Sequence, residues 1–151
     1  MVVVLSPGAA SAADVYNSPA VAEGVPQEVS INAHSVRGCP TADSCVFTAT
    51  GAIDDHGVIK LESVQAHALP SPVVGTAQYV RTFIGTKGSL TIRLESRIRP
   101  TDDPAVAREE GRWVVVSATG SYASLNGWGS ESGSFNFETA SLDVTYVGYV
   151  H

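Results

Sequence analysis

Apolar and polar residues alternate along most of the chain after residue 27. The clearest case is Ser89–Arg99, in which Leu90, Ile92 and Leu94 alternate with polar or charged residues. Successive side chains of a strand point to opposite faces, so a period of two residues is typical of a half-buried strand. This segment is therefore predicted to be a strand rather than a helix.

Similar runs recur between residues that favour turns. The predicted strands are Glu28–Val36, Cys45–Ile53, Val58–Ala66, Thr76–Ile84, Ser89–Arg99, Arg112–Thr119, Ser130–Phe137 and Ser141–Val150. Asp54–Gly57 and Gly85–Gly88 have the composition of tight hairpin turns, and Leu69–Pro72 reads as a connection. The longest polar stretch, Pro100–Gly111, is predicted to be an insertion with one helical turn that begins at Asp103.

About eight short strands, with no long amphipathic helix among them, predict an all-β fold. A sheet of this size that no helix covers must close or fold on itself to protect its edges. We therefore predict a single closed antiparallel barrel over residues 28–151.

The N-terminal segment predicts export. Val2–Leu5 is a short apolar run, and Ala10–Ala12 fits the small-residue cleavage pattern of a secretory signal. Because the run is short and has no positive residues before it, we interpret residues 1–13 as a truncated signal peptide remnant; a disordered leader rich in Ala and Ser is the alternative. Residues 14–27 are predicted to form a flexible arm. No stretch approaches the ~20 apolar residues of a membrane span, so no membrane partner is expected.

Cys39 and Cys45 support the same localisation. They flank the turn-like segment Pro-Thr-Ala-Asp-Ser, and in an exported protein a pair at this spacing favours a disulfide over a metal site. Reduced cysteines with no role are the alternative. A zinc site would need two further ligands, and no suitably spaced histidine pair lies nearby. We expect neither a metal nor a cofactor.

The formal net charge of −6 disfavours polyanionic partners. No cluster of Lys or Arg is present, so binding to nucleic acid is not expected. The same charge disfavours anionic membrane surfaces.

Two segments carry a family resemblance. Arg112–Gly129 places a glycine-rich corner directly after a hydrophobic strand, and Phe83–Leu90 contains the pattern Phe-x-Gly-x-x-Gly. Together they resemble the barrel family shared by allene oxide cyclases and dirigent proteins, including its small secreted bacterial members. The resemblance covers about residues 45–150 and implies the same barrel. The family often has Gly-Thr-Gly where this chain has Ala118, Thr119 and Gly120, and the shared motifs imply a fold rather than an activity.

The glycine corner also has a physical interpretation of its own. Gly120, Gly127 and Gly129 permit backbone angles that other residues resist. Tyr122 and Leu125 are expected to fold inward and plug one end of the barrel.

The charged face of Ser89–Arg99 can be interpreted in two ways. If Arg93, Glu95 and Arg97 point into the barrel, a carboxylate between two guanidinium groups could orient a polar ligand. If they point outward they form a solvated strand face, and the apolar residues on the opposite face favour this second interpretation.

Aromatic residues are concentrated in the second half of the chain, where they either fill the barrel or line a pocket. The candidates for ligand binding are Arg93, Glu95, Arg97, Trp113, Tyr122, Phe135, Phe137 and Tyr146. No catalytic residue can be assigned. The carboxylates of Glu62, Glu138 and Asp143 and the four scattered histidines show no spacing that selects an acid–base pair or a triad.

The function expected from these observations is an exported binding module for a small apolar molecule. The alternative is a cofactor-free cyclase or isomerase that acts inside the barrel, which needs an enclosed cavity and converging polar groups. Assembly into a homo-oligomer is left open.

Overall fold

The computed structural model describes residues 24–36, 39, 42–68 and 75–151. The predicted signal remnant, most of the predicted arm and the connection at residues 69–72 lie outside this part of the chain.

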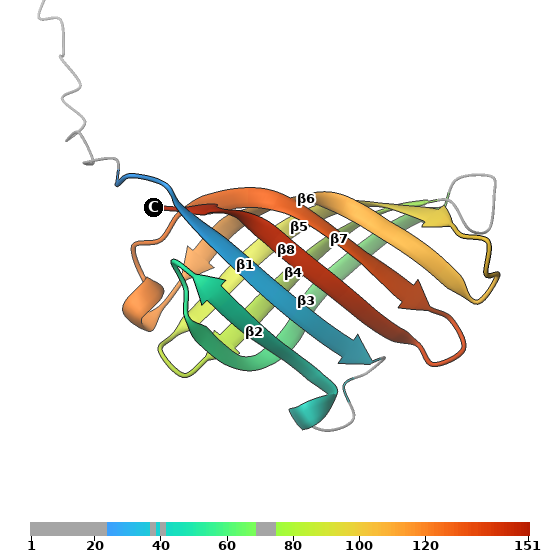
Figure 1. Ribbon diagram of the computed structural model, residues 1–151, viewed down its shortest axis with the longest axis horizontal. Coiled ribbons are helices and arrows are strands. Elements are labelled where there is room, and N and C mark those ends of the chain that lie inside the picture. Colours follow the sequence, from blue (N-terminus) through green and yellow to red (C-terminus); the bar gives the residue numbers. More distant parts are fainter. Residues whose placement is uncertain (1–23, 37–38, 40–41, 69–74) are drawn as a thin grey trace, which may run out of the picture.

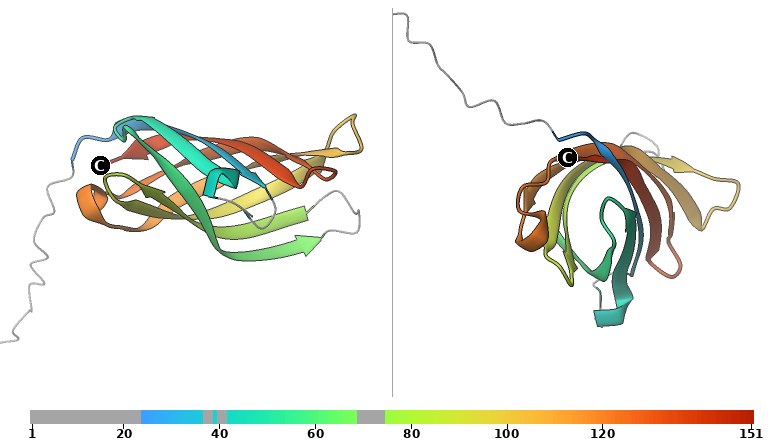
Figure 2. Two further views of the ribbon diagram at one scale, coloured as in Figure 1. Left: turned by 90° about the horizontal axis from the view of Figure 1, so that it is seen from below. Right: turned by 60° about the vertical axis from the view of Figure 1, so that its left-hand side comes forward.

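Eight antiparallel strands close into one barrel, which confirms the predicted fold class (Figure 1). The strands are β1 (Gln27–Val36), β2 (Cys45–Gly51), β3 (Asp55–Ala68), β4 (Gly75–Gly85), β5 (Ser89–Pro100), β6 (Val106–Ala118), β7 (Gly127–Asn136) and β8 (Ser141–Val150). Each strand pairs with its neighbours in the sequence, and β1 pairs with β8 along its whole length to complete the ring. Figure 2 shows the strands curling around a common interior.

The contact between β2 and β3 is the shortest ladder of the barrel. It extends only from the pair Val46–Val58 to the pair Ala49–Asp55. Beyond this point β3 continues to Ala68, paired with β4 on its other side, with a register shift between Leu61 and Ser63. Within the described residues, the edge of β3 beyond Val58 therefore has no ladder partner on the β2 side.

Inward-facing residues from every strand form one hydrophobic core. Its largest fully buried members are Trp113, Tyr146, Phe83, Ile92 and Leu94. The Trp113 indole lies against Gly129, where an added Cβ would approach the ring to 2.7 Å. Gly129 is therefore explained by this close packing rather than by an unusual backbone angle, whereas Gly120 does adopt a positive φ of +61°.

One end of the barrel is closed by the short 3₁₀ helix η2 (Gly120–Tyr122). Tyr122 is buried in the core, and the partly buried Leu125 packs against it, as expected for a plug. The Tyr122 hydroxyl donates a hydrogen bond of 2.7 Å to the carboxylate of Asp55. Asp55 also accepts bonds from the backbone N–H and the hydroxyl of Thr86 and from the backbone N–H of Lys87.

These bonds fix the charge state of Asp55. Desolvation alone would raise the pKa of this carboxyl group, but the hydrogen bonds from Thr86, Tyr122 and Lys87 hold the pKa well below its ordinary value. Asp55 thus links the β2–β3 turn, the β4–β5 turn and η2 through one ionised side chain.

Two segments predicted to be loops are partly strand. The helical turn predicted within Pro100–Gly111 is not formed, because β6 begins at Val106 and continues through the expected insertion. Asp103 instead stabilises a turn by accepting a bond from the backbone N–H of Ala105. The hairpin turn predicted at Asp54–Gly57 ends earlier, since β3 begins at Asp55. In both places polar residues that resembled a loop belong to strands.

Candidate functional site

A cavity of about 710 Å³ occupies the end of the barrel opposite the plug. This volume is within the range of small-molecule sites. Its walls come from all eight strands, so the barrel itself encloses it. The apolar residues that line it include Ile59, Ile98, Ala107, Phe135, Phe137 and Leu142.

A buried arginine lies at the inner part of this cavity. Arg81 on β4 is 7% exposed and lines the cavity. Its guanidinium donates a hydrogen bond to the hydroxyl of Tyr146, and its Cζ lies 4.7 Å from the centre of the Tyr79 ring. Burial alone would lower the pKa of Arg81, but Tyr146 and the nearby charges of Glu109 and Glu131 raise it. The positive charge is therefore retained inside the barrel.

Glu109 faces the same space from β6. Its side chain is 3% exposed, it lines the cavity, and its Oε1 atom has no hydrogen-bond partner in the described structure. Desolvation, the charge of Glu109 and a side-chain hydrogen bond to Glu109 raise the pKa of the Tyr79 phenol well above its ordinary value. Buried carboxylate oxygens are almost always paired, so an unpaired one that faces a cavity indicates a site that another group can complete.

Glu131 on β7 lies deeper in the barrel. It is also 3% exposed, and it accepts a hydrogen bond from the hydroxyl of Ser96 while its Oε2 atom has no partner in the described residues. Desolvation and the charge of Glu109 raise the pKa of Glu131 to about 7. The interior therefore holds two carboxyl groups and one guanidinium group.

None of these charges forms a direct ion pair. The two ion pairs shorter than 4.0 Å among the described residues are His34–Asp143 and Lys60–Glu62, and neither includes Arg81, Glu109 or Glu131. The interior charges interact with one another at longer range, and their closest polar contacts are those of Arg81 with Tyr146, of Glu131 with Ser96 and of Glu109 with Tyr79.

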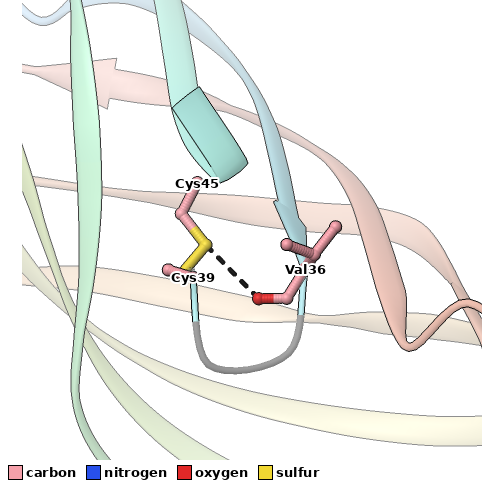
Figure 3. Close-up of a disulfide and its surroundings, with 3 residues drawn as sticks. All are labelled: Val36, Cys39 and Cys45. Atoms are coloured by element: carbon pink, nitrogen blue, oxygen red, sulfur yellow. Dashed lines mark hydrogen bonds between the residues drawn. A yellow bond between two sulfur atoms is a disulfide. The ribbon is translucent and has the colours of Figure 1, made fainter. Parts of the chain in front are cut away.

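A disulfide joins Cys39 and Cys45 (Figure 3). Both residues line the cavity at its mouth. Their Cα atoms are 5.5 Å apart, which confirms the pairing predicted from spacing. The Cys45 sulfur also lies 3.5 Å from the carbonyl oxygen of Val36 at the end of β1. The disulfide thus holds the start of β2 beside the segment that follows β1.

The predicted ligand-binding residues are distributed over three environments. Phe135 and Phe137 line the cavity and contact each other with ring centres 5.1 Å apart, and Phe137 is half exposed at the mouth. Tyr146 is fully buried against Arg81, while Trp113 and Tyr122 belong to the core and the plug. Arg93, Glu95 and Arg97 are exposed, so of the two interpretations of this strand face the structure has the outward one.

The other polar residues considered from the sequence lie on the outside. Asp143 pairs with His34 at 2.6 Å, Glu62 pairs with Lys60 at 3.0 Å, and Glu138 is exposed. His56 and His67 are exposed residues of β3.

The sequence reasoning missed Arg81, Ser96, Glu109 and Glu131, which form the polar interior. The sequence does contain a signal for them. Each lies an even number of positions from inward-facing apolar residues of its own strand, as Glu109 does from Ala107 and Trp113, and therefore shares their face. A charged residue on an apolar strand face is rarely fully buried without a reason. Glu109 lies in the segment predicted to be an insertion, but it belongs to β6.

In the described residues, no group of three or more His, Cys, Asp or Glu side chains could hold a metal ion. No helix of this part of the chain has the length and apolar character needed to cross a membrane.

Comparison with known proteins gave no significant match to a family model, to a curated protein or to a solved structure.

Proposed function

We propose that this protein is an exported carrier that binds a small, largely apolar molecule inside its barrel. The observation that carries the proposal is the cavity of about 710 Å³ that opens at one end, while Tyr122 closes the other. Aliphatic and aromatic side chains supply most of its lining, and Arg81 and Glu109 supply a few converging polar groups. This combination is characteristic of small-molecule sites.

The test is organic extraction of the protein purified from its native source, followed by mass spectrometry, together with titration of the apo protein with the uncharged fluorophore N-phenyl-1-naphthylamine. We expect a co-purified lipophilic compound and saturable fluorophore binding. Ala107→Leu, which fills the cavity wall, should weaken fluorophore binding at least tenfold. The matched control Ala52→Leu, at an exposed position near the closed end, should leave it unchanged. Equal binding by both variants would place the fluorophore elsewhere and contradict the proposal.

Export is supported by the Cys39–Cys45 disulfide, because such bonds persist in oxidising compartments. Cell fractionation of the native source, with thiol alkylation before lysis, tests this point. We expect the oxidised protein outside the cytoplasm, and a reduced cytoplasmic pool would contradict it.

We also propose that the chain belongs to the allene oxide cyclase and dirigent barrel family. It is supported by the position of the two segments that carry the resemblance. They lie side by side at the closed end, where the Thr119 N–H donates to the Ser89 carbonyl at 2.9 Å.

A cyclase or isomerase is the second candidate function, favoured by the ionisable groups at the cavity. Arg81 could hold a substrate carbonyl oxygen while Glu109 removes a proton from the adjacent carbon and returns it elsewhere. Incubation of any extracted compound with fresh protein, followed by chromatography, tests for an isomer of unchanged mass. Conversion that Glu109→Gln abolishes would favour the enzyme, and recovery of the unchanged compound would favour the carrier.

A further inference from the structure

The polar interior of the cavity has a definite chemical asymmetry. Its acceptor side is only partly satisfied, since Tyr79 makes a side-chain hydrogen bond to Glu109 while the buried Oε1 atom of Glu109 is unpaired in the described structure. Its donor side is partly satisfied, since Arg81 already donates to Tyr146 and lies over the Tyr79 ring. What the site still requires is therefore a second hydrogen-bond donor, directed at Oε1 of Glu109.

The charges point in the same direction. Two carboxyl groups, Glu109 and Glu131, share the interior with the single guanidinium of Arg81, and neither lies within 4.0 Å of it. Lys60 also lines the cavity, but it is exposed and already paired with Glu62 at 3.0 Å. A carboxylate ligand would bring a third acidic group into this interior, where like charges repel strongly and are poorly solvated.

We propose that the cavity selects apolar molecules whose polar end donates a hydrogen bond to Glu109, namely alcohols or amines, and discriminates against carboxylates. This inference rests on the proposed ligand-binding function and names the class of its ligand. The polar end lies beside Glu109 and Arg81, and the apolar part extends along Ile98 and Phe135 toward the exposed Phe137 at the mouth.

Alcohols and amines can both donate a hydrogen bond to Glu109. A series of ligands with the same chain length and different polar ends tells the two apart. The full-length protein is loaded with N-phenyl-1-naphthylamine at pH 7.5, and 1-decanol, decylamine, decyl methyl ether and decanoate compete for the site. We expect the alcohol, the amine or both to displace the fluorophore at concentrations about tenfold or more below those of the ether and decanoate. Preference for decylamine would identify a cationic donor, and preference for decanol a neutral one.

The remaining outcomes overturn the inference in distinguishable ways. Displacement by decanoate or by the ether at concentrations as low as those of both decanol and decylamine refutes the donor requirement but leaves a ligand-binding barrel. Failure of the fluorophore and of all four compounds to bind refutes both the inference and the proposed function.

A matched pair of variants tests whether Glu109 is responsible for the preference for donor ligands over decanoate. Glu109→Gln keeps the size of the side chain, removes its charge and adds an N–H donor, so the preference for decanol or decylamine over decanoate should fall about tenfold. Glu110→Gln changes the neighbouring exposed carboxylate and should behave as wild type. Unchanged selectivity in Glu109→Gln would overturn the assignment. If this variant does not fold, the wild-type ligand series still decides.

Discussion

At the scale of single residues, the barrel contains buried carboxyl groups that differ in how many hydrogen-bond donors surround them. Asp55 is surrounded by donors that favour its ionised form. Glu131 has one donor, Ser96, and lies near a second carboxyl group. Burial is common to both residues, so hydrogen bonding decides which of them stays charged.

Glu131 is expected to make the stability of the protein depend on pH. Its pKa is about 7 in the folded protein against an ordinary value of 4.5. The folded state therefore binds the proton more tightly than the unfolded state does. Protonation of Glu131 thus adds to the free energy of unfolding, fully below pH 4.5, and this contribution is lost as the pH rises through about 7. A tenfold change in proton affinity is worth about 1.4 kcal/mol, so the loss is on the order of 3 kcal/mol.

Urea denaturation from pH 5 to pH 8 measures this effect. Glu131→Gln should remove most of this slope and be more stable than wild type at pH 8, whereas the exposed control Glu110→Gln should retain the wild-type slope. A parallel pH dependence in all three proteins would contradict the role of Glu131.

Asp55 is expected to be the most sensitive single position of the plug. Asp55→Asn loses the charge that Thr86, Lys87 and Tyr122 bind, and it places an NH₂ group where an acceptor is required. We expect a loss of about 2–4 kcal/mol in the free energy of unfolding, measured by urea denaturation at pH 7. The neighbouring Asp54→Asn, at an exposed position, should cost much less. Similar losses in the two variants would contradict the assigned role.

At the scale of secondary-structure elements, the two ends of the barrel are stabilised in different ways. The closed end uses η2 and the Asp55 hydrogen bonds, whereas the mouth uses a covalent bond between the start of β2 and the segment after β1. The mouth can therefore stay open while its first two strands remain in place.

Removal of the disulfide is expected to destabilise the mouth. Replacement of both Cys39 and Cys45 by Ser releases a short loop, which should cost about 2 kcal/mol of the free energy of unfolding. Urea denaturation measures the loss, and wild-type protein with the bond reduced should show the same value. No loss in either sample would show that the bond does not constrain the unfolded chain.

At the scale of the whole molecule, the ring of strands is uneven. The ladder between β2 and β3 is short, whereas β3 and β4 pair from Gly57–Gly85 to Ala68–Gly75. Fewer ladder hydrogen bonds join the barrel at this seam, so local opening should begin there.

Hydrogen exchange followed by mass spectrometry tests this expectation. Peptides from β2 should exchange faster than peptides from β5, which is paired along most of its length on both sides. Equal protection of the two strands would show that the barrel opens only as a unit.

The sequence by itself determined the eight strands, apart from the starts of β3 and β6, together with the closed antiparallel barrel and the disulfide, because alternation, turn residues and cysteine spacing are local signals. It also predicted that Tyr122 plugs one end, since the glycine corner aims this residue inward. Only the tertiary structure decided which residues meet inside. Arg81, Glu109 and Glu131 are far apart in the chain, and only closure of the ring brings them together. Glu109 resembles a loop residue until the register of β6 places it beside Arg81 in an apolar barrel.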